Sequence, residues 1–154
     1  MRVEPLNGHN RAGFATGIAE LDRYFRAQAA RETAKGLAAV FVLLREGRVG
    51  GFYCLTPATV LLPDLVGGAK ASARYPTLPA AFLPRLGVDQ RWRGIGLGRA
   101  LLEDARTRLR ATAPDAVALI AHAPDEAAQS FYSHAGLRSF PDQPSRMFEA
   151  LRAV

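Results

Sequence analysis

The clearest chemical signal in the sequence is a glycine-rich stretch that precedes a segment with helical periodicity. It carries glycine at three alternate positions, Gly94, Gly96 and Gly98, between Arg93 and Arg99. Glycine lets successive backbone N–H groups point the same way and lets an anion approach without meeting a Cβ atom. The first N–H groups of a helix lack internal partners and carry the positive end of its dipole. The stretch therefore predicts a phosphate or pyrophosphate site, to which the two arginines supply charge.

Other interpretations of this stretch stay open on its residues alone. A tight turn from strand to helix, with no ligand, would look similar. A Walker loop ends in Gly-Lys-Ser or Gly-Lys-Thr, whereas this one ends in Gly98, Arg99 and Ala100. A dinucleotide-binding fingerprint needs an acidic residue about twenty positions later, at the end of a second strand. Asp115 stands near that distance, but it precedes its expected strand.

Hydrophobic periodicity predicts the elements that must position this loop. Leucine or alanine recurs every four residues from position 97 to position 109, which predicts a helix with one apolar stripe. Residues 81–88 predict the strand that leads into the loop. Residues 39–56 predict a β-hairpin whose turn lies at Glu46 and Gly47.

The spacing Arg-x-x-Gly-x-Gly at residues 93–98 resembles the acetyl-CoA pyrophosphate loop of the GNAT family of N-acetyltransferases. In that family a second block follows, made of a strand, an acidic or Asn residue, and a helix that carries Phe-Tyr before a glycine. Here residues 117–122 match the strand, residues 125–132 match the helix, and Gly136 supplies the glycine. The resemblance therefore rests on two blocks in the family's order and spacing.

This resemblance implies an α/β (α+β) fold of a single domain spanning residues 1–154. The sheet is expected to be central and mixed, with about six or seven strands, and to be flanked by about four helices. In the GNAT fold the fourth and fifth strands splay apart and form a slot for the pantetheine arm of acetyl-CoA. Pro84 suits such a splayed position, because it cannot donate to a sheet ladder.

The resemblance also implies acetyl-CoA as the acetyl donor, without a metal ion. It implies that Tyr132 is the general acid that protonates the departing thiolate, which suits a hydroxyl with a pKa near 10. Packing beside Phe131 is the alternative role for this tyrosine. Asp125 is expected to cap its helix and to contact the cofactor. The expected cofactor-binding residues are Leu86, Val88, Arg93, Gly94, Ile95, Gly96, Gly98, Arg99 and Asp125.

The N-terminal segment resembles one branch of the GNAT family, the toxins of bacterial toxin–antitoxin pairs. The matching residues are His9, Asn10, Phe14, Gly17, Leu21, Asp22, Tyr24 and Phe25. This second resemblance implies that the protein acetylates aminoacyl-tRNA and stops translation. It also implies a ribbon-helix-helix antitoxin and a homodimer.

The charge balance agrees with an RNA substrate. The formal net charge is +6, and 18 of the 20 basic residues are arginine, which favours a polyanionic partner. The plain alternative is an arginine-rich solvated surface. A basic helix is predicted by apolar residues at helical spacing, namely Ile18, Leu21, Phe25 and Ala29. The residues expected to contact tRNA are Arg23, Arg26, Arg31, Lys35, Lys70, Arg74, Arg85 and Arg91.

The sequence offers no clear general base, since His122 at the end of a strand is expected to be structural. A lysine amine has a pKa of about 10.4 and must lose a proton before it attacks, whereas an α-amino group, near 7.7 to 8.0, is partly neutral. Esterifying the adjacent carboxyl group lowers that pKa further. The amine of an aminoacyl-tRNA therefore needs little base assistance, which favours the toxin interpretation.

Two other functions are compatible with the sequence: a GNAT enzyme that acts on a small-molecule or protein amine, and a non-catalytic module that binds acyl-CoA or nucleic acid. The single cysteine, Cys54, excludes an internal disulfide and a cysteine-rich metal site and is expected to pack within a strand. No apolar run approaches the ~18 residues of a membrane helix, and the N-terminus lacks the apolar stretch of a signal peptide. We therefore expect a cytoplasmic protein.

Overall fold

The computed structural model describes residues 1–61, 64–65 and 77–152. The chain divides into two compact units. The first unit comprises residues 1–56 and 84–105, and the second comprises residues 57–83 and 106–154. Lys70 and Arg74, two of the residues expected to contact tRNA, lie outside the described residues.

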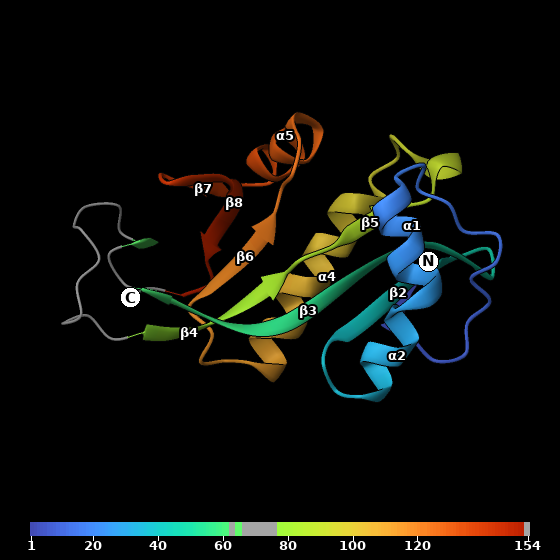
Figure 1. The fold of residues 1–154 in the computed structure, drawn as a ribbon, viewed down its shortest axis with the longest axis horizontal. Coiled ribbons are helices and arrows are strands. Elements are labelled where there is room, and N and C mark those ends of the chain that lie inside the picture. The colour runs from blue at the N-terminus through green and yellow to red at the C-terminus, as the bar shows by residue number, and fades with distance from the viewer. Residues whose placement is uncertain (62–63, 66–76, 153–154) are drawn as a thin grey trace. The chain divides into compact units, whose positions relative to one another are not determined.

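Both units combine strands with helices (Figure 1). The first unit holds β1 (Arg2–Pro5), α1 (Ala19–Ala27), α2 (Ala29–Ala34), β2 (Ala39–Arg45), most of β3 (Arg48–Leu61), β5 (Leu86–Val88), the 3-10 helix η1 (Gln90–Trp92) and the first part of α4 (Leu97–Thr112). The second unit holds the rest of β3 and α4, together with β4 (Thr77–Leu83), β6 (Ala118–His122), α5 (Glu126–His134), β7 (Arg138–Phe140) and β8 (Gln143–Ala150). Within the described part of the chain, no helix is long and apolar enough to cross a membrane.

The strands of the first unit are antiparallel and follow the order β1, β2, β3 and β5. β2 and β3 form the predicted hairpin. Its turn residues, Glu46 and Gly47, have φ angles of 53° and 75°. Positive φ at both central residues gives the turn a twist that matches the twist of the two strands. The hairpin prediction is therefore confirmed, and β3 continues beyond the predicted end at residue 56.

Alternate residues of β3 point to opposite faces of this sheet. A different helix covers each face. The ring of Phe52 lies on the α1 side, with its centroid 4.5 Å from that of Phe25 and 5.8 Å from that of Phe14. Gly51 lies on the α4 side, where an added Cβ atom would be 2.8 Å from Leu101 Cδ1. Helix α4 can approach β3 this closely because residue 51 is glycine.

A hydrogen bond also fixes α4 on β3. Tyr53 is fully buried, and its hydroxyl group donates to Asp104 Oδ2 at 2.5 Å. The apolar stripe predicted for the helix is confirmed, because its four members are each at most 5% exposed: Leu97, Leu101, Ala105 and Leu109.

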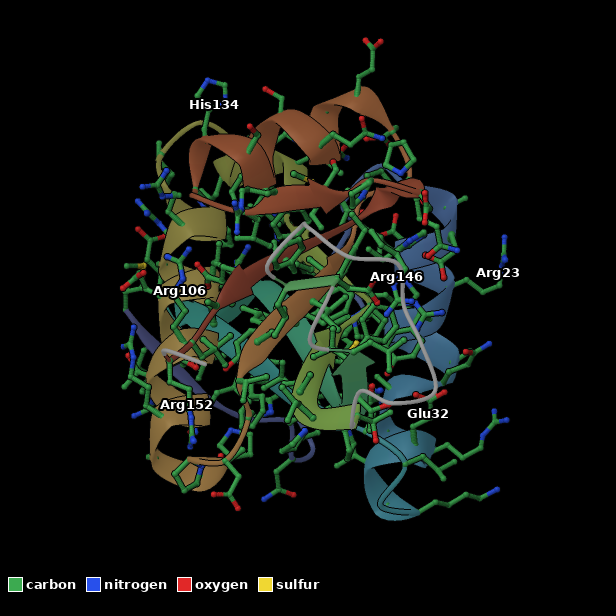
Figure 2. All side chains as sticks on the ribbon, turned by 90° about the vertical axis from the view of Figure 1, so that its left-hand side faces the viewer. Arg23, Glu32, Arg106, His134, Arg146 and Arg152 are labelled. Atoms are coloured by element: carbon green, nitrogen blue, oxygen red, sulfur yellow. The ribbon has the colours of Figure 1, made fainter. Side chains whose placement is uncertain are left out.

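The second unit contains the one parallel strand pair recorded in the described residues. β4 runs parallel to β6, whereas β6 with β8 and β8 with β7 are antiparallel. This confirms a mixed sheet. Arg106 of α4, labelled in Figure 2, contacts Glu149 of β8 through Nε at 2.6 Å and Nη2 at 2.9 Å, and it also donates to the carbonyl oxygen of Ala135 at 2.7 Å. This two-point contact joins the second part of α4 to β8 and to the end of α5.

The segment predicted as one strand over residues 81–88 is two strands in the structure. β4 ends at Leu83 and β5 begins at Leu86, with Pro84 between them. β4 forms its ladder with β6, whereas β5 forms its ladder with β3. Proline lacks the N–H group that a continuous ladder needs, which explains why the ladder is interrupted at Pro84.

The described residues contain eight strands, close to the expected number of about six or seven. Two expectations for the N-terminal segment need correction. The basic helix near the N-terminus is two helices, α1 and α2, which meet at Gln28. Ile18 precedes α1 as its N-cap residue and is 47% exposed, so it does not belong to the apolar face.

Replacing Gly51 with alanine should destabilise the protein, because the new Cβ atom would lie 2.8 Å from Leu101 Cδ1 and 3.0 Å from the carbonyl oxygen of Gly87. Overpacking of this kind costs about 1–3 kcal/mol, so we expect the melting temperature to fall by several degrees. Gly13→Ala is the matched control, since a Cβ atom there meets nothing within 4 Å. Thermal unfolding followed by circular dichroism measures both variants, and equal effects would contradict the close approach.

Candidate active site

Residues 93–96 form an open turn between η1 and α4. Gly94 and Gly96 have φ angles of +78° and +89°, in the left-handed region that favours glycine. A Cβ atom built on either glycine meets no other atom within 4 Å. Ile95 between them is 53% exposed. The backbone of the turn is therefore accessible to a ligand, as the glycine pattern predicts.

The first turn of α4 presents backbone donors at the end of this open turn. The helical hydrogen bonds begin where Ala100 N donates to the carbonyl oxygen of Gly96 at 3.0 Å. The amides of residues 97–99 precede that ladder. The first turn of α4 contains no acidic residue, whereas those of α1, α2 and α5 each contain at least one. With Arg99 exposed in the same turn, these features fit a pyrophosphate group.

β5 directs part of its backbone away from β3. Hydrogen bonds to β3 flank the strand, one from Asp89 N at 2.9 Å and one to the carbonyl oxygen of Arg85 at 3.1 Å. Hydrogen-bonded and non-hydrogen-bonded positions alternate in an antiparallel pair. The register therefore places Leu86 and Val88 at non-hydrogen-bonded positions, with their N–H and C=O groups turned away from β3. These groups fit the predicted role of binding the pantetheine arm.

Two arginines at the start of the turn, Arg91 just before it and Arg93 as its first residue, have partners within the first unit. Arg91 contacts Asp89 twice, from Nε to Oδ1 at 2.9 Å and from Nη2 to Oδ2 at 3.0 Å. Arg93 donates through Nη2 to the carbonyl oxygen of Thr16. Burial alone would raise the pKa of Asp89, but hydrogen bonds from Arg91 and from the amide of Ala15 hold that pKa below its usual value.

Asp89 is a residue of this site that the sequence patterns did not single out. The side chain is 1% exposed and accepts the backbone N–H of Arg91 at 2.9 Å, which caps η1. The signal that could have found it is an acidic residue directly after a strand and two residues before an arginine.

The four basic residues predicted on the N-terminal helix are all exposed, namely Arg23, Arg26, Arg31 and Lys35. Figure 2 shows the Arg23 side chain extending away from α1. Arg26 Nη2 donates to the carbonyl oxygen of Phe14 at 3.0 Å, and Arg31 Nη2 donates to that of Ala27 at 3.0 Å. α1 and α2 thus carry exposed positive charge, part of which also braces the local structure.

Arg85 and Arg91, also expected to contact tRNA, are both engaged with carboxylate groups. Arg85 Nε lies 2.9 Å from Glu20 Oε1. Its guanidinium group is also 4.0 Å from the centroid of the Tyr24 ring, within the range of a cation–π contact. Arg91 is bound to Asp89. Their contact with tRNA stays a prediction.

α5 carries the two predicted residues of the second unit. Asp125 is its N-cap residue and accepts the N–H of Ala128 through Oδ1 at 2.8 Å, which confirms the capping role. Tyr132 is 4% exposed, and its ring centroid lies 5.1 Å from that of Phe131. The structure therefore places the loop and β5 together in the first unit, and Asp125 with Tyr132 in the second.

Two buried groups on the α1 side of the first sheet keep their protons at neutral pH. Burial raises the pKa of the Cys54 thiol to about 11, so this cysteine is a packed strand residue, as expected. Burial also raises the pKa of Tyr24, whose hydroxyl group donates to Glu32 Oε1 at 2.9 Å. Cys54 is therefore not an activated nucleophile.

Known proteins resemble this chain over most of its length. The sequence profile of the Acetyltransferase (GNAT) family matches residues 10–137. The chain is 36% identical over 134 residues to the tRNA-acetylating toxin of Mycobacterium tuberculosis, covering 85% of this chain and 80% of that toxin. It is 32% identical over 166 aligned positions to the probable toxin TacT of Sinorhizobium fredii, covering 99% of this chain and 92% of that protein.

Solved structures show the same fold. AtaT complexed with acetyl-methionyl-tRNAfMet has a TM-score of 0.83 and 21% identity, covering 97% of this chain and 94% of that chain. A mutant AtaT toxin bound to acetyl-CoA and the C-terminus of the antitoxin AtaR has a TM-score of 0.81 and 19% identity, covering 97% and 92%. These likenesses confirm the predicted fold. Because the family profile runs through most of the sequence, including both motif blocks, the chain belongs to the GNAT family of acetyltransferases.

Proposed function

We propose that this protein is a toxin that transfers the acetyl group of acetyl-CoA to the α-amino group of an aminoacyl-tRNA and so blocks translation. The observation that carries this proposal is the 36% identity to the tRNA-acetylating toxin of Mycobacterium tuberculosis across 85% of the chain. The exposed positive charge of α1 and α2 supports a polyanionic substrate. As a GNAT acetyltransferase, the protein uses acetyl-CoA as its donor.

In this proposal the first unit binds the donor. The open turn at Gly94 and Gly96 and the amides of residues 97–99 bind the pyrophosphate group. The backbone of Leu86 and Val88 binds the pantetheine arm, because its polar groups are turned away from β3. These contacts hold the acetyl group in a fixed position for attack.

The proposed reaction forms a bond between the amine nitrogen and the carbonyl carbon and breaks the carbon–sulfur bond. Acetyl-CoA supplies the acyl group already activated as a thioester. Backbone N–H groups of β5 bind the carbonyl oxygen and stabilise its developing negative charge. Tyr132 donates its hydroxyl proton to the departing sulfur and regains a proton from solvent, while the amine releases one to solvent. We propose direct transfer from the thioester to the amine, because Cys54, the one cysteine of the chain, is fully buried and its pKa is raised by burial.

The proposed partners follow from the same resemblance. AtaT has been solved bound to its antitoxin AtaR and to an acetylated tRNA. For this chain we propose a ribbon-helix-helix antitoxin, a homodimer, and action in the cytoplasm, where charged tRNA is found. We also propose that both units belong to one catalytic domain, because the family match at residues 10–137 runs through both.

Gly96→Asp should abolish acetyl-CoA binding, because it places a side chain and a negative charge where the pyrophosphate is proposed to lie. Gly36→Asp is the matched control: Gly36 also has a positive φ, +71°, and open space around it, so the strain and the charge change are alike. Isothermal titration calorimetry with acetyl-CoA measures both variants. Unchanged affinity in a folded Gly96→Asp protein would overturn the loop assignment.

Tyr132→Phe should lower kcat by ~10²–10⁴-fold, the usual contribution of a general acid, and leave the acetyl-CoA Kd unchanged. The loss should appear in the transition state alone. Tyr24→Phe, which removes the hydroxyl group of another buried tyrosine, is the control and should keep kcat within about twofold. Single-turnover acetylation of aminoacyl-tRNA measures the rates. If Tyr132→Phe keeps near wild-type turnover, Tyr132 is a packing residue and not the general acid.

Replacing Arg23 and Lys35 with Glu should raise the KM for aminoacyl-tRNA and leave acetyl-CoA binding intact, since both side chains are exposed on or beside α1 and α2. Binding of aminoacyl-tRNA should also weaken steeply with salt. The logarithm of the binding constant should fall with the logarithm of the salt concentration, with a slope of about −0.7 to −0.9 per neutralised phosphate. The control is the double variant Arg110→Glu with Arg138→Glu, which changes the net charge equally at exposed positions of the second unit. If the Arg23 and Lys35 variant and its control have the same KM for aminoacyl-tRNA, and the enzyme rapidly acetylates a polyamine or peptide, a general amine acetyltransferase is favoured.

A further inference from the structure

A short N-terminal segment lies along the residues that precede the proposed pyrophosphate loop. We call residues 13–17 the strap and residues 89–93 the loop base; both belong to the first unit. The strap connects the N-terminal strand to α1, and the loop base connects β5 to the open turn before α4. The strap thus contacts the loop base, which precedes the glycines of the loop.

Hydrogen bonds join the strap to the loop base at several points. Gln90 N donates to the carbonyl oxygen of Ala15 at 2.9 Å, and Ala15 N donates to Asp89 Oδ2 at 3.3 Å. Arg93 donates to the carbonyl oxygen of Thr16. The last residue of the strap also fits closely against the loop base. A Cβ atom on Gly17 would lie 3.0 Å from Gln90 Oε1 and 3.3 Å from Arg93 Nη2.

α1 holds the other side of the strap. Asp22 Oδ1 accepts two hydrogen bonds from Thr16, one from its backbone N–H and one from its hydroxyl group, both at 2.8 Å. Thr16 also contacts β5, since a Cβ atom on Gly87 would lie 2.9 Å from Thr16 Cγ2. The Asp22 carboxylate of α1 therefore fixes Thr16, and the carbonyl oxygen of Thr16 accepts the hydrogen bond from Arg93.

The burial of polar groups is concentrated at this junction. Among the residues that the structure describes, the buried polar or charged side chains are Thr16 and Asp89, each 1% exposed. Burying a polar group is unfavourable unless it is hydrogen-bonded, and both of these are fully engaged. The two residues lie on opposite sides of the same contact, one in the strap and one in the loop base.

From this arrangement we infer that the strap preorganises the acetyl-CoA site, and that Asp22 and Asp89 are positioning residues for the donor. Asp22 acts through Thr16 and Arg93, and Asp89 acts through Ala15 and Arg91. This inference rests on the proposed function of the loop at residues 93–98.

The physical reason is the conformational freedom of the glycine-rich turn. No atom lies within 4 Å of the Cβ position of Gly94 or Gly96, so the turn is held at its ends, by the contact of Arg93 with Thr16 and by the hydrogen bond from Ala100 N to the Gly96 carbonyl oxygen. Ordering such a turn on binding opposes affinity. Fixing its base at Arg93 reduces the freedom that the ligand must remove. Loss of the strap contacts should therefore weaken donor binding, while the bound donor still reacts normally.

Asp22→Ala tests this inference directly. We expect the acetyl-CoA Kd to rise about tenfold, measured by calorimetry on the full chain. The KM for acetyl-CoA should rise in parallel, with kcat at saturating donor within about twofold of wild type. Asp22→Asn, which keeps an acceptor oxygen for Thr16, should restore most of the affinity.

Glu149→Gln is the control for general destabilisation, because it weakens the contact with Arg106 in the second unit. It should lower the melting temperature and leave the acetyl-CoA Kd unchanged. If Asp22→Ala does not fold, Thr16→Val removes the hydroxyl donor at nearly constant volume and should raise the Kd by about threefold. Wild-type affinity in a folded variant of Asp22→Ala or Thr16→Val, or an equal loss in Glu149→Gln, would overturn the inference.

The loop assignment and the strap inference fail in different ways. If Gly96→Asp binds acetyl-CoA as wild type does, the donor site lies elsewhere and the inference fails with it. If Gly96→Asp abolishes binding and Asp22→Ala leaves it unchanged, the loop assignment holds and the strap alone loses its role.

Discussion

The close approach of α4 to β3 at Gly51 is the contact on which the donor side of the molecule depends. Any larger residue at that position would meet Leu101 of α4 and the carbonyl oxygen of Gly87 in β5. Gly51 therefore contacts both α4 and β5. The N-terminus of α4 provides backbone donors, and the backbone N–H groups of β5 that point away from β3 stay available. Tyr53, two residues along on the same face, adds the hydrogen bond to Asp104 that fixes α4. The two sets of N–H groups are thereby held within one compact unit.

The loop and its support have opposite physical characters. The turn at Gly94 and Gly96 is open, which lets a ligand reach its backbone, and glycine itself restricts the backbone conformation of the turn little. Its base is dense, with the buried pair of Thr16 and Asp89 and a carboxylate from α1. In a site of this kind the glycines make the backbone accessible, and the strap holds the base of the turn in one conformation. The N-terminal segment is therefore part of the donor site in this arrangement.

Sequence patterns predicted the features that depend on local geometry. The apolar stripe of α4 and the hairpin turn at Glu46 and Gly47 follow from residue type and spacing, and both are present. The single strand predicted over residues 81–88 was wrong, because Pro84 divides it into two strands. The motif blocks led to the correct family because their spacing reflects one strand–loop–helix geometry. What the sequence did not reveal was Asp89 and its contacts with the strap, since these join residues more than seventy positions apart. Periodicity describes an element, and it carries no information about which distant segment lies against it.

The ionisable groups of the chain constrain the choice of acceptor. Cys54 retains its proton because its pKa is raised by burial to about 11, so an acyl-cysteine intermediate is not expected. The acceptor amine must be neutral to attack the acetyl carbon, because only the neutral form carries a free lone pair. At pH 7 a lysine amine of pKa 10.4 is neutral in about one molecule in 2,500, whereas an α-amino group of pKa 7.7 to 8.0 is neutral in about one in 6 to one in 11. This advantage of roughly 200- to 400-fold comes before any lowering by the ester bond to tRNA. It lowers the need for a general base, which agrees with a mechanism whose proposed catalytic side chain, Tyr132, is an acid.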